Sequence, residues 1–135
     1  MVYNIICIIR GEYNDIGGIM NEEQFTLERL NRLRKSAGHQ LLSTLPAGEQ
    51  RTPGNCVIAR ALQDIDPTVV VFSEGIFTDN KEFARIIANS FGHNYELDIV
   101  MNDTRYQFGV AVPLPMASFI DNFDEGLYPE LVLSN

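Results

Sequence analysis

The sequence is poor in cysteine and in positive charge, and it has no tryptophan. Its two cysteines, Cys7 and Cys56, show no Cys-x-x-Cys or histidine-rich spacing, which argues against a disulfide framework or a metal site and fits a reducing cytoplasm. Only 10 Lys and Arg stand against 18 Asp and Glu, so the net charge of -8 repels polyanions. We therefore expect neither nucleic acid nor an anionic membrane as a partner.

Long hydrophobic runs are missing as well. No stretch approaches the ~20 apolar residues of a membrane helix. The start lacks the basic-then-apolar pattern of a signal peptide, so we expect none. What is present is ordinary for a globular protein: 135 residues, of which 45% are hydrophobic and 21% are charged. This length and composition predict a single domain over residues 1–135 that buries its own core.

Apolar periodicity divides the chain into strands and helices. Short, β-branched, nearly continuous apolar runs predict buried strands at residues 2–9 and 68–73. Two further strands are predicted at residues 95–101 and 131–133. Apolar residues at helical intervals predict helices at residues 22–45, 55–65, 80–91 and 116–123. The remainder of the region from residue 102 to 129 contains Pro113, Pro115 and Gly126, and it is expected to form loops.

The order of these elements predicts an α/β fold. Strands that alternate with helices are typical of parallel βαβ crossovers, so we expect a three-layer sandwich with a mainly parallel sheet flanked by helices. In such sheets the ligand crevice lies beyond the carboxyl ends of the strands. Residues 10–14, 73–79 and 134–135 should therefore converge on one site.

A family resemblance follows from the same segments. Arg10-Gly11-Glu12, at the end of the first predicted strand, resembles the Arg-His-Gly-Glu signature of the histidine phosphatase (phosphoglycerate mutase-like) superfamily, but without the histidine. Residues 25–30, 70–88 and 129–135 are similar, in the same order, to later blocks of that family. The resemblance spans nearly the whole chain and implies a phosphoglycerate mutase-like sandwich.

The resemblance also implies that the family's chemistry is lost. In the family one histidine accepts the phosphoryl group, while two arginines and a second histidine hold the phosphate oxygens and an acid protonates the leaving group. Arg10 matches the first arginine, but Gly11 follows it where the nucleophile would stand. Asp79 occupies the place of the second arginine, Asn135 replaces the second histidine, and Asp103 matches the acid loosely. A carboxylate repels a phosphate that a guanidinium would bind.

We therefore expect a catalytically inactive, histidine phosphatase-like domain that acts by binding a protein, a second copy of itself or a small ligand. No catalytic residue, cofactor or metal is assigned. The candidate residues of the degenerate pocket are Arg10, Glu12, Asn14, Ser73, Asp79, Asp103 and Asn135.

Two other functions remain open. The first is a divergent phosphohydrolase that acts on a phosphate ester or phosphohistidine, with His93, Asp79 or Ser73 as an unconventional nucleophile. The second is an unrelated anion-binding α/β domain, although the glycines of a P-loop or a dinucleotide fingerprint are missing. Simple structural roles compete at single residues: Arg10 can form a surface ion pair, and Asp79 can sit at a helix N-terminus. The acidic cluster of residues 121–125 is interpreted as a solvated loop.

Overall fold

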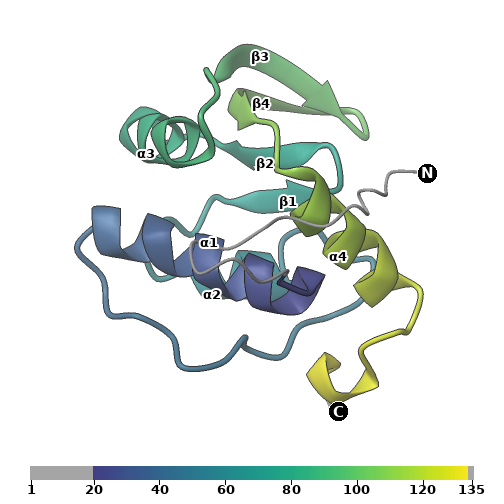
Figure 1. The fold of residues 1–135 in the computed structure, drawn as a ribbon. Helices are drawn as coiled ribbons and strands as arrows, with labels where there is room; N and C mark the ends of the chain where they lie inside the picture. Colours follow the sequence, from purple (N-terminus) through teal and green to yellow (C-terminus); the bar gives the residue numbers. More distant parts are fainter. Residues whose placement is uncertain (1–19, 134–135) are drawn as a thin grey trace.

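The computed structural model describes residues 20–133 of the chain (Figure 1). Its helices are α1 (Glu22–Ser36), α2 (Val57–Leu62), α3 (Lys81–Phe91), α4 (Leu114–Asp124) and the short 3-10 helix η1 (Pro129–Leu131). Its strands are β1 (Val70–Phe72), β2 (Gly75–Thr78), β3 (Glu96–Met101) and β4 (Thr104–Val110). None of the described helices is long and apolar enough to cross a membrane.

The four described strands form one antiparallel sheet in the order β1-β2-β4-β3. The predicted parallel sheet is therefore wrong, and with it the phosphoglycerate mutase-like sandwich. The prediction failed because it treated β2 and β4 as loops. β2 has only four residues and starts at a glycine, while β4 carries polar residues that hide its alternation. The predicted strand at residues 2–9 lies outside the described residues.

Tight turns make the antiparallel pairing possible. Asn102 and Asp103 connect β3 to β4 with φ values of 50° and 64°. Two consecutive left-handed residues define the type I′ turn, which matches the twist of a hairpin and is most often built from Asn, Asp and Gly. Ser73 and Glu74 also form a two-residue loop, between β1 and β2, but without positive φ values. Both turns lie at the same end of the sheet, on the right of Figure 1.

The helices close a core against this sheet. α3 packs on β2 and β4, α2 packs on β1, and α1 packs against α2, α3 and α4. Burying large apolar side chains is the main favourable term in folding. The largest fully buried side chains include Phe25, Leu30, Leu33, Ile58, Leu62, Ile76, Ile87, Met116, Phe119 and Phe123.

The helix predicted at residues 22–45 ends early, at Ser36. Asn21 caps its start by accepting a hydrogen bond from the Gln24 amide at 2.8 Å. Gly38, with φ of 78°, turns the chain away after the helix. The Asn31 side chain then holds the returning loop, because it accepts from the Leu42 amide at 2.7 Å and donates to the Leu42 carbonyl at 2.9 Å.

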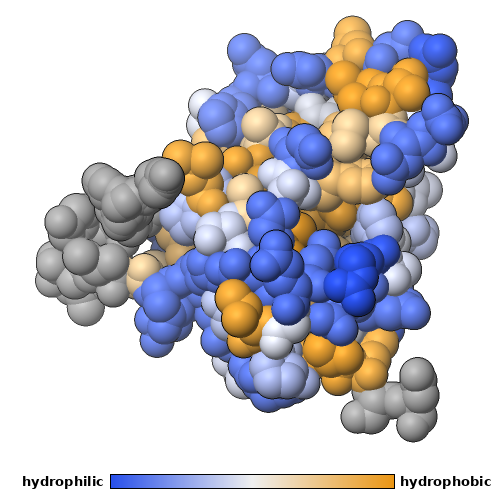
Figure 2. Space-filling view, turned by 90° about the vertical axis from the view of Figure 1, so that its right-hand side faces the viewer, coloured by the Kyte–Doolittle hydropathy of each residue, from blue (hydrophilic) through white to orange (hydrophobic). Residues whose placement is uncertain are grey.

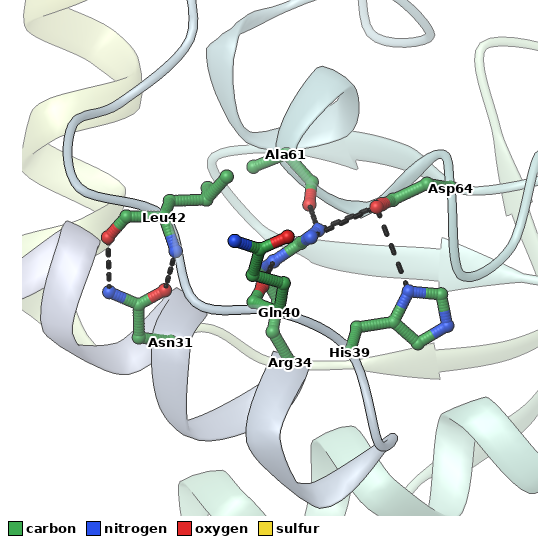
Figure 3. A network of polar contacts seen from close by, with 7 residues as sticks. All are labelled: Asn31, Arg34, His39, Gln40, Leu42, Ala61 and Asp64. Carbon is green, nitrogen blue, oxygen red and sulfur yellow. Dashed lines mark hydrogen bonds and ion pairs between the residues drawn. The ribbon is translucent and has the colours of Figure 1, made fainter.

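A buried arginine joins the end of α1 to the end of α2 (Figure 3). Arg34 is only 5% exposed. Its guanidinium donates to the Asp64 carboxylate at 2.8 and 2.9 Å, to the Ala61 carbonyl at 2.6 Å and to the Gln40 carbonyl at 2.7 Å. His39 Nδ1 lies 3.6 Å from the same carboxylate. The hydrogen bond from Arg34 lowers the pKa of Asp64.

The predicted strand at residues 131–133 is also wrong. Pro129 to Leu131 form the turn of η1, and Val132 then makes only an isolated parallel bridge with Gly48. Gly48 is needed there, because a Cβ atom would lie 2.2 Å from the Val57 amide nitrogen. The helices predicted at residues 80–91 and 116–123 are confirmed as α3 and α4, and the strand predicted at 95–101 is confirmed as β3.

Candidate functional site

A cavity of about 270 Å³ opens at the end of the sheet that carries both turns. Four parts of the fold form its wall: the loop at residues 51–53, the start of α2, the β1–β2 turn and α4, with Asn102 added from the β3–β4 turn. Figure 2 looks onto this side of the molecule, where hydrophilic residues in blue stand beside hydrophobic ones in orange. The cavity thus collects residues from segments that are far apart in the sequence.

The floor of the cavity is apolar. It consists of core side chains that are each at most a few per cent exposed, namely Val57, Ile58, Val71, Phe119 and Phe123. Packed neighbours on the core side hold these side chains in place, so the floor is preformed. Such a surface favours the apolar part of a ligand.

Cys56 also lines the cavity, at the residue before α2. It is buried and is the free cysteine of the described residues. Burial raises the pKa of the Cys56 thiol above its usual value. Since the thiolate is the nucleophilic form, this cysteine stays neutral and unreactive near pH 7.

The rim is charged, and mostly negative. Glu74 reaches it from the β1–β2 turn, while Asp121 and Asp124 reach it from α4. Arg51 is the cation among the described lining residues, and its backbone has an unusual left-handed φ of 54°. The Arg51 amide donates to the Asp124 carboxylate at 2.8 Å, and its guanidinium donates to the Asp124 carbonyl at 2.5 Å.

The electrostatics of the rim act most clearly on Asp121. Desolvation raises the pKa of the Asp121 carboxyl, and the negative charges of Asp124, Glu74 and Glu125 raise it further. The Ser73 hydroxyl opposes this shift. The carboxylate of Asp121 is therefore held in an environment that disfavours its negative charge, which a bound cation would relieve.

The described lining residues do not include the parts of a familiar catalytic centre. They contain no histidine and no lysine, and the one thiol is neutral. In this set the Ser73 hydroxyl lies beside carboxylates only, with Glu74 at 3.5 Å. No group of three His, Cys, Asp or Glu side chains within residues 20–133 has the arrangement of a metal site.

Only part of the predicted site can be located. Ser73 lines the cavity, and Asp103 lies in the β3–β4 turn next to the lining residue Asn102. Asp79 lies at the opposite end of β2, where its carboxylate accepts a hydrogen bond from the Gln107 amide at 3.0 Å and extends the β2–β4 ladder. The structure therefore does not bring Ser73 and Asp79 together. The remaining candidates lie outside the described residues: Arg10, Glu12, Asn14 and Asn135.

Sequence reasoning missed most of the rim. Asp121 and Asp124 were interpreted as part of a solvated loop, whereas they lie three residues apart on α4 and share one face of that helix. That spacing was the available signal, since a helix at residues 116–123 was itself predicted. Glu74 lies within residues 73–79, which were expected at the site, but it was not named as a candidate. Arg51 could not have been assigned, because only the folded structure brings its loop to α4.

A second polar cluster has a structural role. The Glu22 carboxylate accepts hydrogen bonds from Ser118 at 2.7 Å, from Asn122 at 2.9 Å and from the Tyr128 hydroxyl at 2.6 Å. Burial, and then the hydrogen bond to Glu22, raise the pKa of Tyr128. Because each of these groups has a partner, the cluster ties α1 to α4 and to the following segment and offers no free group to a ligand.

Comparisons with family models, curated proteins and solved structures found no match. The class of protein is therefore set by the fold alone: a small α/β domain with an open antiparallel sheet and a rimmed cavity. The resemblance to histidine phosphatases is not supported by the fold, and the proposed function does not depend on it.

Proposed function

We propose that this domain is a non-catalytic binding domain that holds a small organic ligand in the cavity between the β1–β2 turn and α4. The observation that supports it is the combination of a preformed apolar floor with a polar rim. Binding sites for small molecules commonly combine these two features, because the floor supplies affinity and the rim fixes orientation.

The divergent phosphohydrolase is less well supported. A phosphate ester at this rim would meet the carboxylates of Glu74, Asp121 and Asp124, which repel it. Of the unconventional nucleophiles considered, His93 follows α3 and Asp79 lies at the far end of β2, so neither lines the cavity. Ser73 does line it, but the described lining contains no histidine or lysine to act as its base.

The proposal is tested by screening a library of small organic fragments against the ¹⁵N-labelled full chain by NMR. A cavity of this size suits fragment-sized ligands, for which dissociation constants of about 0.1–1 mM are expected. Binding should shift the amide signals of residues 51–58, 71–74 and 119–124. A set of hits whose shifts all map elsewhere would contradict the proposal.

A matched pair of variants tests whether the ligand binds in this cavity. Ser73→Trp puts a large ring at the mouth of the cavity and should abolish fragment binding. Asn89→Trp places the same ring on the exposed surface of α3 and should leave binding unchanged. Steady turnover of p-nitrophenyl phosphate that Ser73→Ala removes would instead favour the phosphohydrolase.

A further inference from the structure

We infer that the ligand of this cavity is an organic cation: an ammonium or guanidinium group carried on a short apolar stem. The inference rests on the proposed function and adds the chemical class of the ligand. It follows from two separate features of the cavity, its apolar depth and the unbalanced charge at its mouth.

The apolar interior of the cavity indicates that the ligand has an apolar stem. The floor presents aliphatic and aromatic side chains, among them Ile58, Phe119 and Phe123, with no charged group among these buried residues. Burying an apolar stem against them is favourable by about 25 cal/mol per Å² of surface removed from water. An ion without such a stem would gain little here, which distinguishes the site from a simple cation site.

The carboxylates at the mouth of the cavity indicate the charge of the ligand. Among residues 20–133, no Lys or Arg forms an ion pair with Glu74 or Asp121. Asp124 accepts a hydrogen bond from the Arg51 amide, while the Arg51 guanidinium is directed to the Asp124 carbonyl rather than to the side-chain carboxylates. Within the described part of the chain, two rim carboxylates at the entrance to an apolar cavity thus have no cationic partner.

The position of these carboxylates matters as much as their number. A charge beside a low-dielectric wall interacts more strongly with a ligand charge than one on an open surface. The net charge of -8 adds a field of the same sign over the whole chain. A cationic ligand is therefore attracted at long range and at contact, while an anionic ligand of the same shape is repelled at both.

The test compares three ligands that share one stem and differ in charge. Phenethylamine, 2-phenylethanol and phenylacetate are titrated separately into the full chain at pH 7, and dissociation constants are measured by NMR. The amine should bind at least about threefold more tightly than the alcohol, within the range of an exposed ion pair. The acid should bind more weakly than either.

Asp121→Asn tests the rim directly. It should weaken amine binding by about three- to fivefold and leave alcohol binding unchanged. Glu82→Gln removes one negative charge from α3, away from the cavity, and should change neither. Raising the salt concentration to 1 M in the unsubstituted protein should weaken binding of the amine but not of the alcohol, and this measurement does not depend on the folding of any variant.

The outcomes separate the two proposals. If the alcohol and the acid bind at the cavity as tightly as the amine, the cation inference is overturned and the binding function stands. If none of the three ligands binds and the fragment screen finds no ligand at the cavity, both are overturned. Tighter binding of the amine that is lost in Asp121→Asn and in high salt supports the inference.

Discussion

Charge is arranged in opposite ways at two ends of the molecule, the helix ends around Arg34 and the cavity rim. At the far end of α1, the Arg34 guanidinium satisfies the Asp64 carboxylate and two backbone carbonyls, so its charge is matched inside the fold. At the cavity, the carboxylates of Glu74 and Asp121 have no cationic partner among the described residues. At the first place the charges contribute to stability; at the second they are the charges that the proposed ligand would meet.

The largest effect is expected where the charges are matched. Arg34→Met should lower the free energy of unfolding by about 2–3 kcal/mol, because it leaves two carbonyls and a carboxylate without their donor. Urea denaturation measures the change. Arg32→Met is the control: it removes an exposed ion pair with Glu28, at 2.6 Å, and should cost less than about 1 kcal/mol. Equal losses in the two variants would contradict the structural role of Arg34.

A smaller effect is expected from the strained backbone at the cavity rim. Arg51→Ala and Arg51→Gly remove the same hydrogen bond to the Asp124 carbonyl, but only glycine adopts a φ of 54° without steric cost. The glycine variant should therefore be more stable than the alanine variant by about 1 kcal/mol. Thermal unfolding of the two proteins side by side gives the difference, and an alanine variant of equal stability would show that residue 51 is not held in this conformation.

Asp121→Asn should change stability in the direction opposite to Arg34→Met. The raised pKa of Asp121 means that the folded state binds its proton more tightly than the unfolded state does. Ionised Asp121 therefore destabilises the fold at neutral pH, and the neutral amide should raise the denaturation midpoint slightly. A lower midpoint would mean that Asp121 has a stabilising partner, and the contrast between the two ends would be lost.

The pH dependence gives the finest comparison, because the two carboxyls shift in opposite directions. The lowered pKa of Asp64 makes its contribution fully present above its ordinary value of about 3.9 and lost as the pH falls below it. Because the pKa of Asp121 is raised, the fold is more stable at low pH, where this carboxyl is protonated, and less stable at higher pH, where it is ionised. As the pH rises from 3 to 7, the difference in unfolding free energy between the unsubstituted protein and Arg34→Met should widen. Over the same range, Asp121→Asn should become more stable relative to the unsubstituted protein. Parallel profiles would contradict both assignments.

The sequence predicted the helices better than the sheet, for reasons visible in particular residues. Asn21 begins α1 with a side-chain cap, and Gly92, with φ of 73°, ends α3. Caps of this kind are local signals that single residues carry. The end of α1 at Ser36 was missed because the apolar spacing continues to Leu45, which is buried as part of the core after the chain has already left the helix.

The sheet failed because strand direction is not a local property. β1 was found as a buried run, but its partner β2 begins at Gly75, which was assigned to a loop. That glycine is required by packing across the sheet, since a Cβ atom would lie 2.6 Å from the Val110 carbonyl oxygen. Once β2 and β4 were missed, a helix stood between successive strands and the parallel arrangement followed.

The candidate site was predictable in part for the same reason. Ser73 was chosen because it follows a buried strand, and it does line the cavity. Its neighbours in space come from a loop 20 residues earlier and from a helix more than 40 residues later, and only the hairpin topology places them together. A side chain such as Asp121 becomes part of the site only through that arrangement, which its own segment does not reveal.

The central proposal is that the cavity binds a cationic ligand. The most direct test is a titration of phenethylamine into ¹⁵N-labelled full chain at low salt, followed by amide shifts and repeated with Ser73→Trp. We predict saturable shifts at residues 51–58, 71–74 and 119–124 that disappear in the variant. Shifts that are absent, that map to other parts of the molecule or that persist unchanged in Ser73→Trp would contradict it.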